Sequence, residues 1–189
     1  MPYDSRNQNH ETECQAADNQ NELCIAVKIT LDTNCLFDYF ERNPAHIQAL
    51  VTHASEGDIE LAITTRVMSD TLDKWKGSGT SPMWDKIQAF PAVETIGTVF
   101  RLDSSHLGFR DCLASEDEVK MADRLRQIMT GAQVEDVDHL LGHFMNKRDV
   151  FVTSDAHFLD HREELKIEFG LVILAPSDAV EQIEKMYPP

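Results

Sequence analysis

Four aspartates stand at positions where an α/β fold gathers chemistry: Asp32, Asp70, Asp138 and Asp155. Asp32 and Asp155 follow apolar runs that predict buried strands, and the other two lie in segments whose apolar periodicity predicts helices. Carboxylate oxygens are the hard ligands that Mg²⁺ and Mn²⁺ prefer. If the four side chains converge, they form an oxygen-only site for a divalent metal, which is the equipment of a metal-dependent phosphodiesterase.

The elements that must position these aspartates follow from the hydrophobic pattern. Short runs rich in Leu, Ile and Val predict strands at residues 23–31, 58–64, 93–100, 149–154 and 170–176. Helical periodicity, with stop and start residues, predicts helices at residues 33–43, 44–57, 65–76, 83–90, 116–131, 134–147 and 177–187. Strands that alternate with helices indicate an α/β fold, and we expect a three-layer α/β/α sandwich with a mainly parallel central sheet.

Length and hydropathy set the domain organisation. A chain of 189 residues is expected to close over one hydrophobic core. Residues 1–22 are rich in Asn, Gln and acidic side chains, which predicts a flexible N-terminal tail before a domain at residues 23–189. The tail contains no apolar run and no later stretch has the length of a membrane span, so we expect neither an export signal nor a membrane protein.

Charge and cysteine content narrow the function classes. The chain has 17 Lys and Arg against 33 Asp and Glu, a formal net charge of −16, so a polyanionic substrate needs metal ions or a local basic patch to bind. The four cysteines are widely spaced and form no CxxC pair, which argues against a zinc knuckle and a disulfide scaffold. A reducing, cytoplasmic location is the expectation.

Short motifs around the four aspartates resemble a known family. The segment ITLDTNCLF, which contains Asp32, resembles the opening of PIN domains, a family of metal-dependent nucleases that includes the VapC-type toxins. AITTRVMSD is similar to the family's next strand and helix through Asp70, DHLLGHF to its third acidic position at Asp138, and FVTSDAHF to its fourth at Asp155. The ending GLVILAPSDAVEQI also looks like the family's last strand, proline and helix, so the resemblance spans residues 25–183.

This resemblance implies a PIN-like fold and an activity. It implies an Mg²⁺- or Mn²⁺-dependent endoribonuclease in which the four aspartates are both catalytic residues and metal ligands, and water rather than an enzyme nucleophile attacks the phosphodiester. It further implies RNA as the substrate, a homodimer, and an antitoxin or other regulatory protein as partner. Neighbouring Asn34, Thr153 and Ser154 are expected to orient the ligands or water, although such residues equally serve as turn and cap devices.

Two of the four positions have competitors nearby. The second acidic position is more often Glu in the family, and Asp70 is one methylene shorter, so Asp73, one turn along the same helix face, can substitute or assist. Asp136 precedes Asp138 by two residues and leaves the third position open between them. Beyond the carboxylates, Lys74, Trp75 and Lys76 predict a basic, base-stacking lip for nucleic acid, against the alternative that the tryptophan packs a helix on the sheet.

Other readings of the same residues stay open. The pairs His139 with His143 and His157 with His161 have the four-residue spacing of a zinc site, but neither carries the glutamate of an HExxH motif. A haloacid dehalogenase-like phosphatase also places an Asp after its first strand, but the second Asp of that pattern is replaced here by Asn34. The main alternative to the nuclease is a non-catalytic PIN-like module that binds RNA or a protein partner.

Overall fold

The structure is a computed structural model, and it describes residues 26–42, 44–73, 82–90, 93–100 and 111–188. The predicted N-terminal tail lies outside the described residues, as do Lys74, Trp75 and Lys76 of the predicted nucleic-acid lip.

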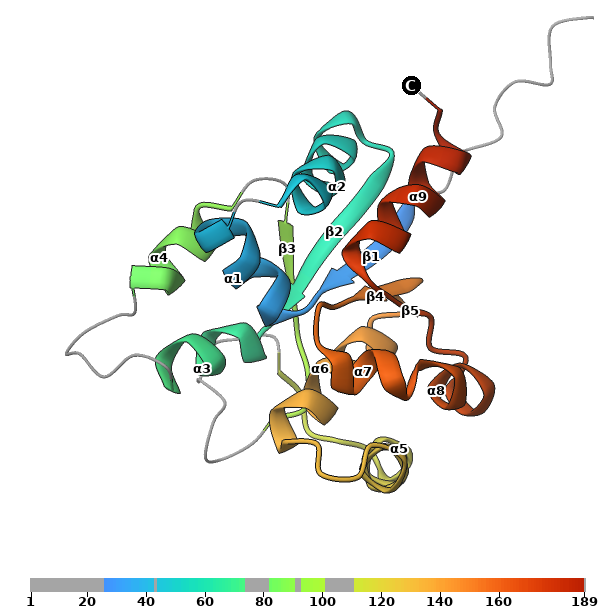
Figure 1. Cartoon of the computed structure of the whole chain (residues 1–189). Coiled ribbons are helices and arrows are strands. Elements are labelled where there is room, and N and C mark those ends of the chain that lie inside the picture. The colour runs from blue at the N-terminus through green and yellow to red at the C-terminus, as the bar shows by residue number, and fades with distance from the viewer. Residues whose placement is uncertain (1–25, 43, 74–81, 91–92, 101–110, 189) are drawn as a thin grey trace, which may run out of the picture.

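A five-stranded sheet forms the centre of the fold, and all its strands are parallel (Figure 1). Its strands are β1 (Val27–Leu31), β2 (Ile59–Thr64), β3 (Val93–Ile96), β4 (Val150–Val152) and β5 (Ile173–Leu174). They lie in the order β3-β2-β1-β4-β5. The chain adds β2 and β3 on one side of β1, then crosses over and adds β4 and β5 on the other side. The carboxyl ends of β1 and β4 therefore meet at the point where the strand order reverses, the usual ligand site of an open α/β sheet.

Helices cover one face of the sheet through α1 (Thr33–Arg42), α2 (Ala45–Glu56), α4 (Pro82–Gln88) and α9 (Pro176–Met186). Their apolar side chains join those of β1 and β2 in a single buried cluster, with Leu36, Leu50, Ile87 and Ile183 among its members. The short helix α3 (Arg66–Asp73) follows β2 and contributes Val67 to the same cluster.

The opposite face is covered by α5 (Glu116–Ile128), α6 (Val134–Met145), α7 (Ala156–Asp160) and α8 (Arg162–Phe169). A second buried cluster fills this side, in which Leu125, Leu140 and Phe158 pack with Phe151 of β4. Two helical layers on a parallel sheet confirm the predicted three-layer α/β/α sandwich.

Several helix ends follow from single residues. Ser115 caps α5: its side chain accepts from the Glu118 N–H, and the Glu118 carboxylate accepts from the Ser115 N–H, as the capping-box pattern predicts. Gly57 ends α2 in the left-handed conformation (φ 88°), which glycine adopts without a Cβ clash.

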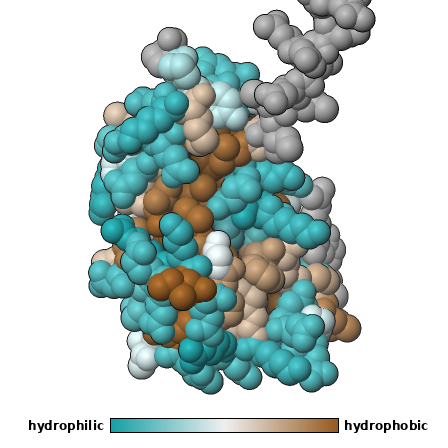
Figure 2. All heavy atoms as spheres, turned by 90° about the vertical axis from the view of Figure 1, so that its right-hand side faces the viewer, coloured by the Kyte–Doolittle hydropathy of each residue, from teal (hydrophilic) through white to brown (hydrophobic). Residues whose placement is uncertain are grey.

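The surface on the α9 side is mostly hydrophilic. Figure 2 shows this face covered largely by hydrophilic residues, with hydrophobic residues visible in a band between them. Among the described residues, no helix has both the length and the apolar character needed to cross a membrane.

Candidate metal centre at the carboxyl end of the sheet

Asp32 and Asp155 lie where their strands predict, beside each other at the point where the strand order reverses. Asp32 directly follows β1, and its backbone N–H donates to the carbonyl of Val152 at the end of β4 (2.9 Å). Thr153 connects the two aspartates, because its hydroxyl donates to Asp32 Oδ2 (2.7 Å) and accepts from the Asp155 N–H (2.9 Å). The predicted supporting residue Thr153 is thus a positioning contact between two predicted site residues.

The Asp32 carboxylate is buried, with the residue 3% exposed. The Thr33 N–H donates to its Oδ1 (2.8 Å) and Thr153 to its Oδ2, but each carboxylate oxygen has a further lone pair for a ligand. Burial raises the pKa of Asp32, and the charge of Asp70 raises it further, while His139 and the hydrogen bond from Thr153 oppose the shift. The ionised form of Asp32 is therefore disfavoured, and a bound cation would favour it.

Each carboxylate oxygen of Asp155 has its own partner. Its Oδ1 accepts from the His157 N–H (2.8 Å), so it is the N-cap of α7. Its Oδ2 accepts from the Asn34 amide (3.3 Å), which ties it to the first turn of α1 beside Asp32. Ser154, also predicted as a supporting residue, is exposed, and its hydroxyl lies 3.9 Å from Cys35 Sγ.

Asp70 joins this group in spite of its short side chain. Its Oδ2 accepts a short hydrogen bond from the Thr33 hydroxyl and lies 2.9 Å from Nε2 of His139. The competing Asp73 is the last residue of α3, and its side chain lies outside the described part of the molecule. The described contacts thus connect Asp70, through Thr33, to the residue that follows Asp32.

At the third acidic position, the structure separates Asp136 from Asp138. The Asp138 carboxylate lies 2.8 Å from Nε of Arg66, and both side chains are 1% exposed, so it forms a buried ion pair. Its backbone carbonyl also accepts from the Thr98 hydroxyl (2.7 Å). A carboxylate held in this way serves as a structural ion pair, so the described contacts place Asp138 with Arg66.

Asp136 instead faces the group. Its Oδ2 accepts from the Gln133 N–H (2.9 Å) at the start of α6. Burial raises the pKa of Asp136 and the charge of Asp155 adds to the shift, while the Gln133 N–H, His139 and His157 oppose it. Asp136 and His139 are three residues apart and share one face of α6.

His139 is the site residue that the aspartate pattern missed. Burial would lower its pKa, but the hydrogen bond to Asp70 and the charges of Asp70, Asp32 and Asp136 outweigh burial and raise it. One signal in the sequence could have found it: Asp138, His139 and His143 interrupt the apolar face of α6, and buried polar side chains need partners.

The histidine pairs do not support the zinc alternative. His139 lies between Thr64 and Asp70, whereas Nδ1 of His143 lies 3.0 Å from the Thr30 hydroxyl. The rings of His157 and His161 meet edge to face with centroids 5.2 Å apart.

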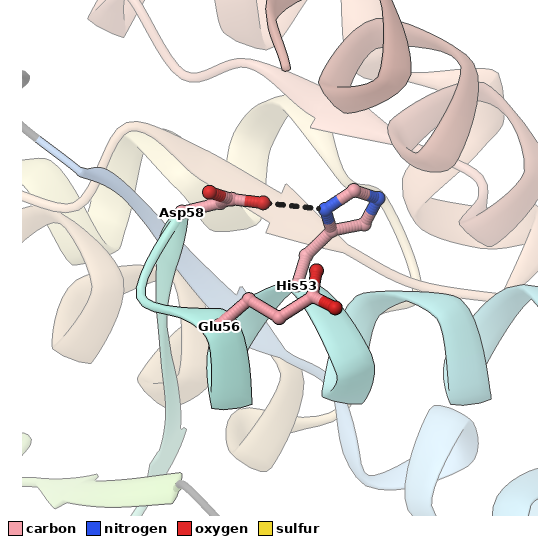
Figure 3. A group of neighbouring side chains, drawn as sticks. All are labelled: His53, Glu56 and Asp58. Carbon is pink, nitrogen blue, oxygen red and sulfur yellow. Dashed lines mark hydrogen bonds and ion pairs between the residues drawn. The ribbon is translucent and has the colours of Figure 1, made fainter. Parts of the chain in front are cut away.

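A different set of residues satisfies a distance criterion for metal binding. Within the described ranges, only His53, Glu56 and Asp58 place three ligand atoms within 4.8 Å of one another, so no three of the aspartate oxygens at the carboxyl end are that close. Figure 3 shows Asp58 facing the His53 ring from the turn after α2, with Glu56 nearby. His53 Nδ1 lies 2.8 Å from Asp58 Oδ2, and the Asp58 N–H donates to the His53 carbonyl (3.0 Å), so the group closes the end of α2 before β2 begins.

The aspartates still fit Mg²⁺ or Mn²⁺ by donor chemistry. Asp32, Asp70, Asp136 and Asp155 offer oxygen ligands, and Mg²⁺ keeps several of its waters, so it does not need every carboxylate in direct contact. Burial is the main cause of the raised pKa values of Asp32 and Asp136, neighbouring carboxylates add to the shifts, and a bound cation would favour the ionised form of both.

A groove opens beside this group. It has a volume of about 600 Å³ and lies between α1, α3 and α4, with Asn34 and Ser154 at the side near Asp155. Two cationic side chains, Arg42 and Lys86, lie in its lining with Phe37 and Met83.

Comparison with known proteins finds similarity in structure rather than in sequence. No protein-family model and no curated protein matches the chain. The crystal structure of VapBC2 from Rickettsia felis bound to a DNA fragment from their promoter is similar, with a TM-score of 0.52 and 14% sequence identity, over 78% of this chain and 97% of that chain. The predicted fold is confirmed: this chain has a five-stranded, all-parallel PIN-like fold, similar to the solved VapBC2 structure.

Proposed function

We propose that this protein is a divalent-metal-dependent endoribonuclease whose centre consists of Asp32, Asp70, Asp136 and Asp155. The observation that carries the proposal is that Asp32 and Asp155 lie at the carboxyl ends of β1 and β4, where an open α/β sheet binds its ligand, and that Asp70 on α3 and Asp136 on α6 lie near them. The PIN-like fold supports a nuclease as the class of enzyme.

In this proposal the four carboxylates bind the cation, and neighbouring side chains orient the carboxylates. Asp32 and Asp155 are fixed by Thr153, and Asp70 by Thr33 and His139, so the carboxylates are arranged before a cation binds. Bound Mg²⁺ or Mn²⁺ lowers the pKa of a water and stabilises charge on phosphoryl oxygens. Asn34, beside Asp155 and at the edge of the groove, is suited to orient that water or the phosphate.

The groove supports RNA as the substrate in spite of the net charge of −16. Lys86 and Arg42 are the side chains of its lining that can bind a phosphate backbone, but Asp38 and Glu41 line the same groove and Arg42 pairs with Asp38 (2.9 Å). A bound cation must therefore supply further positive charge. We further propose that a protein partner controls the activity, because the similar solved structure is VapBC2 bound to promoter DNA. A homodimer and a cytoplasmic location are proposed from the resemblance to PIN domains and the cysteine pattern.

The test is cleavage of a labelled single-stranded RNA with Mg²⁺, with Mn²⁺ and with chelator. We expect metal-dependent cleavage by the wild type and a loss of at least about 100-fold for Asp32→Asn, since a metal supplies several kcal/mol of transition-state stabilisation. A matched control is Glu60→Gln, an exposed carboxylate at the other end of the sheet. Metal-independent cleavage, or equal cleavage by Asp32→Asn, contradicts the proposal. RNA binding without cleavage supports the alternative, a non-catalytic PIN-like module.

A further inference from the structure

A chain of contacts connects β2 to Asp70 through a buried imidazole. Thr64 Oγ1, at the end of β2, lies 2.6 Å from Nδ1 of His139, and Nε2 of the same ring lies 2.9 Å from Asp70 Oδ2. The Thr33 hydroxyl donates to that same oxygen and lies 3.3 Å from His139 Nε2. Both ring nitrogens therefore have partners, and the ring orientation is fixed from two sides.

The position of the ring is fixed by the packing of α6. His139 is 2% exposed. Three residues further along α6, Gly142 approaches the sheet so closely that a Cβ there would lie 3.1 Å from Thr64 Cγ2 and 3.2 Å from Thr98 Cβ. Glycine lets the helix backbone approach β2, and this approach brings His139 within hydrogen-bond distance of Thr64.

Asp70 is the carboxylate of the centre that most needs such support. Asp32 and Asp155 directly flank the strands or caps that hold them, whereas Asp70 projects from α3, a helix of eight residues outside the sheet. Thr33 and His139 come from α1 and α6, so their contacts attach Asp70 to two larger elements.

We propose that His139 is a positioning residue that holds the Asp70 carboxylate in place for the divalent cation, with Thr64 fixing the imidazole from behind. The inference rests on the proposed metal centre but assigns to His139 no contact with the cation. Partners that orient ligands in this way are worth about 10- to 100-fold in metal affinity.

The test is calorimetric titration of the full chain with Mn²⁺, free of RNA. Relative to wild type, we expect His139→Leu to bind Mn²⁺ about 10- to 100-fold more weakly and Thr64→Val to be weakened in the same direction. His139→Gln should recover part of the affinity, because a glutamine amide can donate to the Asp70 carboxylate from the place of Nε2. Thermal melting of each metal-free variant checks folding, and the folded His139→Gln protein keeps the test decisive if His139→Leu does not fold.

The outcomes test the positioning role of His139 separately from the proposed metal-dependent function. Wild-type affinity in folded His139→Leu and His139→Gln overturns the positioning role and leaves the metal centre intact. A loss of binding in His139→Gln as complete as in Asp70→Asn also overturns it, because the imidazole would then be a metal ligand. If the wild type binds no Mn²⁺ while Asp70→Asn leaves the ¹⁵N shifts of the His139 ring unchanged, both the proposed function and the His139 contact fail.

Discussion

The acidic side chains at the two ends of the sheet have different kinds of partner. At the amino end, Arg148 donates to the backbone carbonyls of Ile29 (3.0 Å) and Glu60 (2.5 Å), and the Glu60 and Glu94 carboxylates lie 3.6 and 4.0 Å from its Nη1. At the carboxyl end, the charges of Asp32, Asp70 and Asp136 act on His139, and Asp155 acts on Asp136. At the amino end the carboxylates lie near a guanidinium, whereas at the carboxyl end the contacts described above join the carboxylates to hydroxyl, amide and imidazole groups.

We interpret this difference as one between charged side chains that stabilise the fold and carboxylates that bind a ligand. The carboxyl end also contains a balanced pair, Arg66 with Asp138, only two residues along α6 from Asp136. Buried charges are tolerated when paired, and carboxylates that lie near one another favour binding of a cation. The first prediction therefore removes a charge that is already paired.

Asp138→Asn is expected to have the largest effect on folding and almost none on metal. Removing one partner of a buried ion pair costs about 3–5 kcal/mol, because Arg66 is left charged and buried. Urea unfolding should show this loss, and Mn²⁺ titration of the folded variant should match wild type. Asp136→Asn should give the reverse pattern, with weakened Mn²⁺ binding and a loss of about 1 kcal/mol from its cap of Gln133. If Asp138→Asn loses Mn²⁺ binding while Asp136→Asn keeps it, the assignment of the third position is wrong.

Mn²⁺ should stabilise the wild type through the carboxyl end alone. A ligand that binds only the folded state adds about 2.7 kcal/mol when its concentration is about 100 times Kd. Chemical unfolding with and without Mn²⁺ measures this gain, which should disappear in Asp32→Asn. Equal stabilisation of wild type and Asp32→Asn would mean that Mn²⁺ binds elsewhere.

Acid should destabilise the protein through His143, a buried residue of α6 that packs against the sheet near Arg148. Burial, with the charge of Arg148, lowers the pKa of His143 from 6.5 to about 3, and its neighbours on β1 and β4 are Thr30 and Phe151. The unfolded chain binds this proton below its ordinary pKa while the folded protein does not, so stability falls as pH drops from about 6.5 towards 3.

The contribution of His143 to the acid loss of stability is measured by comparing wild type with His143→Gln. Between pH 7 and pH 5 the His143 contribution falls by about 2 kcal/mol. Urea unfolding at both pH values should show that His143→Gln loses less stability than wild type by about this amount. The raised pKa of Asp32 acts in the opposite direction but is common to both proteins, so it cancels. Identical acid losses in the two proteins would refute the His143 account.

Glu60→Gln should have the smallest effect. Its carboxylate is half exposed and lies 3.6 Å from Arg148, and such pairs contribute about 0–1 kcal/mol. The backbone carbonyl that accepts from Arg148 remains in the variant. Unfolding and Mn²⁺ affinity should both stay near wild type, and a large loss of Mn²⁺ binding would end the contrast between the two ends of the sheet.

Local sequence was enough to predict the sheet and two corners of the centre. All five predicted strands are present, because each apolar run is short, rich in β-branched residues or leucine, and ended by a polar or turn residue. Asp32 and Asp155 follow from this, since a residue after a parallel strand lies at the carboxyl end whatever the surrounding packing is.

The third corner could not be predicted because it depends on the rotation of α6. Residues two apart in a helix point in nearly opposite directions, so only one of Asp136 and Asp138 can face the centre. The rotation is set by Arg66, by the close approach of Gly142 and by His139 against Thr64, all of which are tertiary contacts. The contact between His139 and Asp70 also depends on this rotation, so the sequence shows only the four-residue spacing of His139 and His143.

The most direct test of a cation site at the carboxyl end is an Mn²⁺ titration followed by amide NMR, because bound Mn²⁺ broadens the signals of nearby nuclei. We predict that the amides of Thr33, Asp70 and Asp155 broaden first, at substoichiometric Mn²⁺, while those of Asp58 and Glu60 at the amino end stay sharp. Broadening that begins at Asp58, near His53 and Glu56, or that spreads evenly over the acidic surface, would contradict the account.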